Sequence, residues 1–192
     1  QNNHLPPERM TKVFSKLWRR FWDRVPQQPV SLKQIQPHIE FFRNNRTETT
    51  LTLLGHSTFL WQENVINLIT DSHLSQRPSP VDFIGLERIN HPSIELDELP
   101  LINFVIISHN HNAHLDQKSV LALAKQQQQK PPCFLVPLGL KRQFDDIEIS
   151  QNLIELDWWQ SEKIGQLSFK AVPVQHWSKR GLFDTNKTLW AG

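Results

Sequence analysis

The stretch LINFVIISHNHNAHLD, residues 101–116, decides the fold because it joins a nearly unbroken apolar run to a cluster of histidines. An apolar run of this kind is typical of a strand that is buried on both faces of a parallel sheet. His109, His111 and His114 follow the run directly. Since α/β sheets place their ligands beyond the carboxyl ends of the strands, this stretch predicts a binding site at that edge of a sheet.

The segments around this strand predict a mixed α/β fold. Residues 49–70 read as three short strands joined by hairpins, and residues 71–100 as a long loop with one helical turn near Leu96. Asp116 is a suitable N-cap for a helix over residues 117–130. Further elements are expected as strands at residues 133–136, 153–156, 167–174 and 187–190 and as a short helix at residues 139–145. Strands covered by helices, after an opening made only of strands, indicate a layered α/β sandwich.

Charge divides the 192 residues into two parts. Residues 1–46 carry nine Lys and Arg but three Asp and Glu, whereas residues 47–192 carry twelve and sixteen. We therefore expect a basic N-terminal helix and connector over residues 1–46, followed by one domain over residues 47–192. A nucleic-acid-binding domain is normally basic over its recognition face, so this mildly acidic domain predicts no nucleic-acid partner.

The N-terminal part has the pattern of a basic amphipathic helix over residues 8–25. Its apolar stripe comprises Phe14, Leu17, Trp18, Phe21 and Val25. Such a stripe either packs on the domain that follows or makes peripheral contact with a membrane interface. No apolar run reaches the roughly 18 residues of a spanning helix, so we expect a chain that is cytoplasmic or peripheral on a membrane. Because it begins with Gln1, we also expect that it was processed or cut.

The histidines after the buried strand have the spacing of metal ligands. His109 and His111 are two residues apart on an extended loop and can turn both rings toward one ion, while His114 can reach a neighbouring ion. His176 follows a second apolar strand and would complete the three protein ligands that a catalytic zinc takes. Neutral imidazole also suits iron, nickel and copper. A histidine-rich polar loop, with His176 hydrogen-bonded on its own, is the alternative.

Two other side chains, His56 and Asp71, could carry chemistry, but their positions in the sequence do not decide it. His56 lies between two of the expected strands, and Asp71 follows the third. Turn structure explains both of them equally well. Cys133 is the single cysteine, so it cannot form a disulfide within the chain.

Beyond these spacings, the sequence resembles the metallo-β-lactamase superfamily. His-x-His-x-x-His after an apolar strand is similar to the superfamily motif HxHxDH. Several segments resemble the branch that contains N-acyl-phosphatidylethanolamine-hydrolysing phospholipase D, namely LGHSTFL (54–60), TDSHLSQRPSPVDF (70–83), FLVPLGLKRQF (134–144), IELDWWQS (154–161) and VPVQHWSKRGLFDTNKTLWAG (172–192). The resemblance implies a four-layered αββα sandwich and zinc-dependent hydrolysis of a phospholipid or another phosphodiester.

The resemblance also implies roles for individual residues. His109, His111 and His176 match the ligands of one zinc, and His114 matches a ligand of a second. Asp71 matches an acidic residue that lines the site behind the ligands. The family's reaction uses both ions, which activate water and stabilise the charge on the phosphoryl oxygens.

Two departures from the family pattern lower the activity that we expect of this chain. Ala113 stands where the family has an aspartate that binds the second zinc. The sequence stops at Gly192, where the family continues with the remaining ligands. We therefore expect an incomplete sandwich (the first half plus the edge of the second), at most one zinc, and an inactive or impaired hydrolase. The alternative is a catalytically dead module that binds metal or a membrane surface. The uncovered sheet face also predicts a homodimer.

Overall fold

The computed structural model describes residues 35, 37–75, 92–149, 151–181 and 183–192, all within one unit that spans Gln34–Gly192. The basic helix expected over residues 8–25 lies outside the described residues, as do residues 26–34 and 36 of the connector behind it and residues 76–91 of the long loop.

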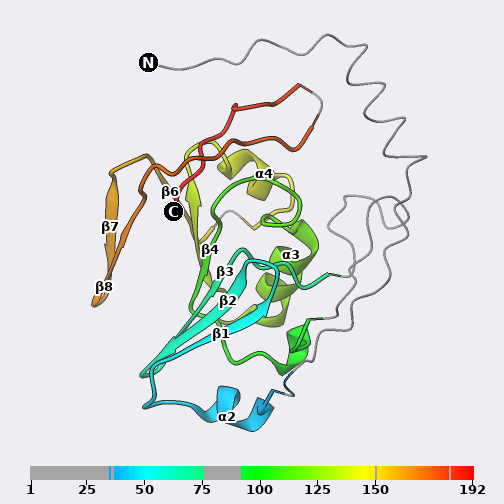
Figure 1. The fold of residues 1–192 in the computed structure, drawn as a ribbon, viewed down its shortest axis with the longest axis vertical. Coiled ribbons are helices and arrows are strands. Elements are labelled where there is room, and N and C mark those ends of the chain that lie inside the picture. The colour runs from blue at the N-terminus through cyan, green and yellow to red at the C-terminus, as the bar shows by residue number, and fades with distance from the viewer. Residues whose placement is uncertain (1–34, 36, 76–91, 150, 182) are drawn as a thin grey trace, which may run out of the picture. The chain divides into compact units, whose positions relative to one another are not determined.

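The centre of the described unit is a six-stranded sheet (Figure 1). In spatial order its strands are β1 (Thr50–Gly55), β2 (Thr58–Glu63), β3 (Ile66–Thr70), β4 (Phe104–Ile106), β5 (Cys133–Pro137) and β6 (Leu153–Leu156). Strands β1 to β3 pair antiparallel, and β3 to β6 pair parallel. The three-stranded opening and the central parallel strand predicted from the sequence are thus confirmed.

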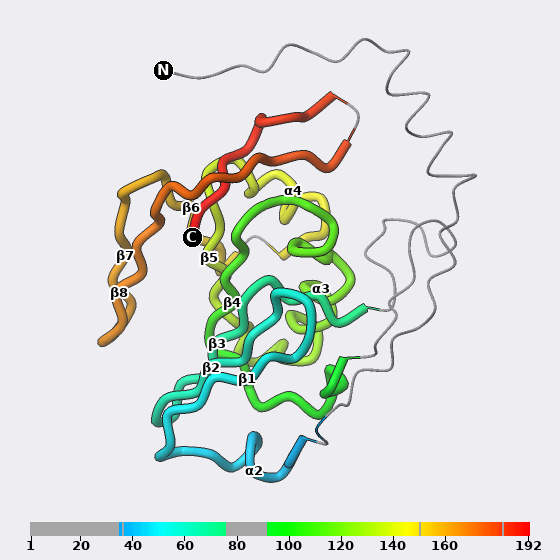
Figure 2. Tube along the Cα trace, in the orientation of Figure 1, coloured from blue at the N-terminus to red at the C-terminus, as the bar shows by residue number. Residues whose placement is uncertain are grey.

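Helices cover one face of this sheet (Figure 2). They are α3 (Gln117–Gln126) and α4 (Lys141–Asp145), and two further elements, α2 (Ile39–Asn44) and the 3₁₀ turn η1 (Leu96–Glu98), lie beside them in the same core. Val120 and Leu123 of α3 and Phe144 of α4 pack on the sheet and are fully buried. Asp116 caps α3 as predicted, since its side chain accepts a hydrogen bond from the Lys118 amide. The helix ends at Gln126 rather than residue 130.

A two-stranded hairpin covers part of the opposite face. Its strands are β7 (Ser161–Ile164) and β8 (Leu167–Lys170). Phe169 packs against Phe104 of the main sheet, with ring centroids 5.0 Å apart. The sequence predicted only one strand here, over residues 167–174, because β7 is short and its two middle residues, Glu162 and Lys163, are charged. The strand that was predicted, β8, ends at Lys170 rather than residue 174. Helices, main sheet and hairpin therefore lie in the order α, β, β that the predicted incomplete sandwich requires.

The last residues of the chain run along the edge of the site rather than forming the predicted strand at 187–190. The Ala191 amide donates a hydrogen bond to the Ser108 carbonyl, and Gly192 exchanges two backbone hydrogen bonds with Val172. These bonds are too scattered among partners to make a regular ladder. They nevertheless tie the end of the described chain to the loop that carries the histidines.

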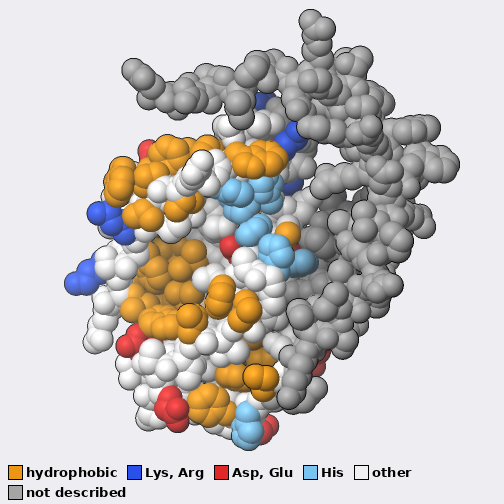
Figure 3. Space-filling view, viewed as in Figure 1, with side chains coloured by type: hydrophobic (Ala, Val, Ile, Leu, Met, Phe, Trp, Pro, Cys, Tyr) orange, Lys and Arg blue, Asp and Glu red, His pale blue; other side chains and the backbone are white. Residues whose placement is uncertain are grey.

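Part of the hairpin-side face stays open in the described residues. Leu51 and Leu53 of β1 are 67% and 55% exposed. A cavity of about 430 Å³ lies between the sheet and the hairpin, with Phe59, Ile106 and Phe169 in its lining. In Figure 3 the histidine side chains reach the surface beside this broad field of hydrophobic side chains.

Candidate metal centre

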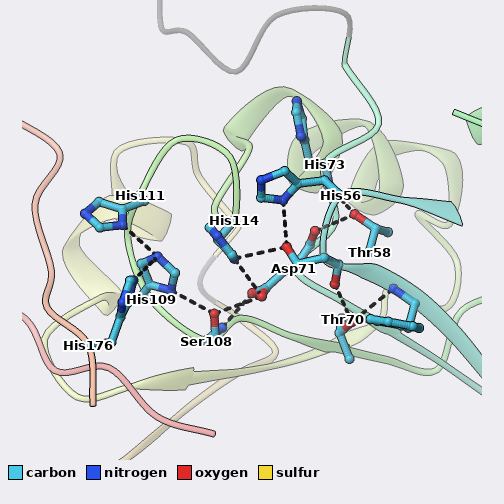
Figure 4. Close-up of polar contacts among 12 residues, drawn as sticks. His56, Thr58, Thr70, Asp71, His73, Ser108, His109, His111, His114 and His176 are labelled. Carbon is cyan, nitrogen blue, oxygen red and sulfur yellow. Dashed lines mark hydrogen bonds and ion pairs between the residues drawn. The ribbon is translucent and has the colours of Figure 1, made fainter. Parts of the chain in front are cut away.

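The candidate site lies beyond the carboxyl ends of β3 and β4, where the sequence placed it (Figure 4). Asp71 directly follows β3, and the histidine loop begins two residues after β4. His176 comes from the segment that follows β8. Because β3 and β4 are parallel neighbours, their carboxyl ends bring residues that are far apart in sequence to one edge of the sheet.

A tight turn folds the histidine loop back on itself. The carbonyl of His111 accepts hydrogen bonds from the amides of His114 and Leu115, both at 2.9 Å. The ring of His109 consequently lies at the centre of the group. Its centroid is 4.5 Å from that of His111, 4.0 Å from that of His114 and 4.2 Å from that of His176.

Three ring nitrogens from two separate segments converge on one point. His109 Nε2 lies 2.8 Å from His111 Nδ1 and 3.0 Å from His176 Nε2. One ring nitrogen from each of the three histidines lies within 4.8 Å of the other two. Nitrogens that are each 2.0–2.1 Å from a tetrahedral zinc would be about 3.3–3.4 Å apart, so the His109–His111 and His109–His176 pairs would have to separate by about 0.3–0.6 Å to hold one.

The surroundings keep the central histidines neutral. Burial, followed by the charges of His114, His111 and His176, lowers the pKa of His109 from 6.5 to about 3. Burial, followed by the charge of His176, also lowers the pKa of His111. Neutral imidazole is the form that binds a metal ion. A divalent cation among these lone pairs therefore fits the donor set better than a proton does.

Asp71 and His114 lie directly behind this group of nitrogens. The Asp71 carboxylate accepts hydrogen bonds from the amide and hydroxyl of Ser108, at 2.7 and 2.8 Å, and from His114 Nδ1 at 2.8 Å. The ring of His114 thus lies beside the three converging nitrogens but does not contribute one of them. This contact leaves its Nε2 as the ring nitrogen that could bind a second ion.

The same cluster is not a serine-hydrolase triad. His114 Nδ1 is 3.1 Å from Ser57 Oγ and 2.8 Å from Asp71 Oδ2. A triad needs the serine and the carboxylate on opposite ring nitrogens, so that the ring can take the serine proton while the carboxylate holds its other side. Here both meet one nitrogen, and this arrangement provides no route for activating Ser57.

His56, the other histidine singled out from the sequence, lies close to the cluster but contributes none of the three converging nitrogens. Its Nδ1 is 2.9 Å from Ser57 Oγ. Its ring packs edge-on against His114 and His73, with centroids 5.1 and 5.8 Å away. His56 therefore belongs to the wall of the site behind His114.

Ala113 lies half-buried in the histidine turn, and the nearby carboxylates are engaged elsewhere. Asp116 accepts from Ser119 Oγ at 2.6 Å and from the Ser75 amide at 3.1 Å. Asp184 accepts from the amides of Arg180 and Gly181. Both carboxylates are thus oriented by hydrogen bonds to groups other than the three converging ring nitrogens.

Arg180 is a residue of the site that the sequence reasoning missed. Its Nη1 donates to the carbonyls of Asn110 and Leu115, at 3.2 and 2.7 Å, so it ties both ends of the histidine turn together. Only its position in the segment after His176 hinted at this role. The two segments that carry the converging nitrogens are thus fastened to each other by one guanidinium group.

Replacing Arg180 with alanine should destabilise the fold and weaken metal binding together. Hydrogen bonds from a charged donor contribute about 1.5–3 kcal/mol, and two carbonyls lose their donor here. We expect urea denaturation to show a loss of that size, whereas Arg142→Ala, at an exposed position on α4, should cost less than about 0.5 kcal/mol. Equal losses in the two variants would show that Arg180 does not hold the turn.

A mixed α/β sandwich with a histidine cluster at the carboxyl edge of its central strands defines a class of α/β domain in which the histidines could hold a metal ion. The sequence model described as "Beta-lactamase superfamily domain" matches residues 67–192, and the chain belongs to this superfamily. The resemblance noted from the sequence, and the fold that it implied, are thereby confirmed.

Curated relatives are similar over most of this chain. An uncharacterised protein of Mycobacterium tuberculosis is 36% identical over 188 residues, which are 97% of this chain and 48% of the relative. N-acyl-phosphatidylethanolamine-hydrolyzing phospholipase D 1 of Caenorhabditis elegans is 33% identical over 149 residues, which are 73% of this chain and 41% of the relative. The chain thus spans about half the length of the curated relatives that it matches.

A solved structure supports the fold. It is that of CmlA, a diiron beta-hydroxylase from Streptomyces venezuelae, with a TM-score of 0.50 and 21% sequence identity. The match covers 66% of this chain and 24% of CmlA. At this identity the likeness concerns the architecture alone.

Proposed function

We propose that this chain carries the histidine ligands of a zinc-dependent phosphodiester hydrolase related to N-acyl-phosphatidylethanolamine-hydrolysing phospholipase D. The observation that carries the proposal is the convergence of one ring nitrogen each from His109, His111 and His176 within 4.8 Å of one another. The similarity to the Caenorhabditis elegans phospholipase supports a phospholipid or another phosphodiester as the substrate.

In this proposal the three histidines hold one zinc and leave its remaining positions open. When bound, the ion supplies Lewis acidity toward a phosphoryl oxygen and activates water. The chain's own part is orientation: the turn places His111 against His109, and Arg180 holds both ends of that turn. His114, fixed by Asp71, is the ligand that this chain would offer to a second ion.

Ala113 favours impaired catalysis in this chain, and with it the alternative of a metal-binding module without turnover. Hydrolysis of bis(4-nitrophenyl) phosphate and of N-acyl-phosphatidylethanolamine micelles, each with and without zinc, tests the proposal. We expect zinc-dependent cleavage near background in the 192-residue chain, and clearly higher cleavage only where Ala113→Asp is combined with the C-terminal part of a relative. Cleavage that survives a chelator, or cleavage of carboxylic esters only, would show that the reaction class is wrong.

Two partners expected from the sequence stay predictions. Membrane contact through the helix at residues 8–25 concerns residues outside the described ones, and among the described helices none is long and apolar enough to cross a bilayer. Homodimer formation would cover Leu51 and Leu53 on the open sheet face, where large exposed apolar groups commonly mark an interface.

A further inference from the structure

Ser108, the residue directly before the first histidine, connects that histidine to a buried carboxylate. Its hydroxyl lies 2.8 Å from Asp71 Oδ2 and 2.8 Å from His109 Nδ1. Its amide donates to Asp71 Oδ1 at 2.7 Å. Asp71 is 7% exposed and His109 3%, so these bonds form away from bulk water.

The direction of each proton follows from the number of donors. A serine hydroxyl has one proton, and an ionised carboxylate can only accept. Ser108 Oγ therefore donates its proton to Asp71 Oδ2, and His109 Nδ1 must donate to Ser108 Oγ. The neutral ring of His109 then carries its proton on Nδ1, and its lone pair is on Nε2, the atom that faces His111 and His176.

The backbone of Asp71 is held in a conformation that few residues adopt. Its φ angle is +40°, in the left-handed region, which aspartate tolerates better than most side chains. The Asp71 amide donates to the Ile106 carbonyl at 2.8 Å, and its own carbonyl accepts from Thr58 Oγ1 at 2.7 Å. These bonds from β2 and β4 fix where the carboxylate lies. Strained backbone that is pinned on both sides is typical of functional sites.

We propose that Ser108 is a positioning residue that, together with Asp71, fixes the tautomer of His109 so that Nε2 is presented to the metal. The same carboxylate fixes His114 directly through Nδ1. One buried aspartate thereby orients a ligand of each proposed ion, by a direct bond on one side and through a serine hydroxyl on the other. Outer partners of this kind hold a metal-binding histidine in one orientation and strengthen it as a ligand.

This inference rests on the proposed metal site, and its test is chosen to separate the two. Ser108→Ala removes the hydroxyl, Ser108→Thr keeps it, and Ser119→Ala is the matched control. Ser119 is also a buried serine whose hydroxyl donates to an aspartate, Asp116, but it does not contact the histidine cluster. Zinc affinity by chelator competition and the His109 tautomer by ¹⁵N NMR of the metal-free chain are measured for each variant.

We expect Ser108→Ala to weaken zinc binding by about 10–100-fold, the usual cost of losing an outer partner of a ligand. Its His109 spectrum should show the Nε2-protonated tautomer appearing. Ser108→Thr should retain most of the affinity and the wild-type tautomer, and Ser119→Ala should change stability only. Tight zinc binding that is equal in the wild type and Ser108→Ala, or an unchanged tautomer, would overturn this inference alone. A wild-type chain that binds no zinc would overturn the metal site and this inference with it.

Discussion

Replacing His111 with alanine should abolish metal binding by this chain. We expect the wild-type protein to retain at most one equivalent of zinc after dialysis, held by His109, His111 and His176. His111→Ala leaves two of three ligands, so the loss should exceed the roughly 10–100-fold that removal of an outer partner costs. Elemental analysis after dialysis and competition with a chromogenic chelator measure the retained metal and its affinity.

The control must separate a lost ligand from a disturbed fold. His111 also packs against Trp177, with ring centroids 4.5 Å apart, so alanine leaves space beneath that indole. His111→Gln fills much of the space without restoring the ring nitrogen at the same place. His38→Ala removes a histidine that caps α2, far along the chain from the loop, and should keep the zinc. Two tightly held equivalents in the wild type, or zinc that survives both His111 substitutions, would refute this assignment.

The sequence predicted those parts of the site whose residues are close together in the chain. His109 and His111 follow a strand that must be buried, so the loop that carries them lies at the carboxyl edge of the sheet. Asp116 could be recognised as a cap from its position alone, and the structure confirms that role. His176 was predicted from an apolar strand expected over residues 167–174, although β8 ends at Lys170.

The parts that the sequence did not show depend on contacts between distant segments. Ser108 meets Asp71 across 37 residues, and Arg180 meets Leu115 across 65. No sequence pattern around Ser108 or Arg180 predicts such a contact, because serine and arginine are common on loops. The hairpin was half missed for a different reason: β7 alternates between exposed and half-buried residues and has no strong apolar signal. Packing against the main sheet, rather than intrinsic preference, makes it a strand.

Restoring the motif aspartate with Ala113→Asp should give the largest gain in function available from one substitution. The added carboxylate would bring negative charge next to His114 and an acceptor for the attacking water. The nearby carboxylates of Asp71, Asp116 and Asp184 are oriented by other groups, since they accept hydrogen bonds from Ser108 and His114, from Ser119 and Ser75, and from the backbone amides of Arg180 and Gly181, respectively. A preorganised group that stabilises developing charge is typically responsible for about 10²–10³ in rate.

The assay uses the 192-residue chain and a chimaera in which the C-terminal part of the Caenorhabditis elegans relative follows Gly192, because this chain spans 41% of that protein. In the chimaera we expect Ala113→Asp to raise the rate of zinc-dependent diester cleavage by a factor of about 10²–10³. We also expect this variant to bind as much as one further equivalent of zinc. Ala113→Asn is the matched control, since it has nearly the same shape without the charge. It should give little of the gain, because a neutral amide offsets far less of a divalent ion's charge than a carboxylate does. Equal zinc-dependent rates in the Ala113, Asn and Asp forms of the chimaera would mean that a charge at this position is dispensable, and that the turn binds its second ion by other means.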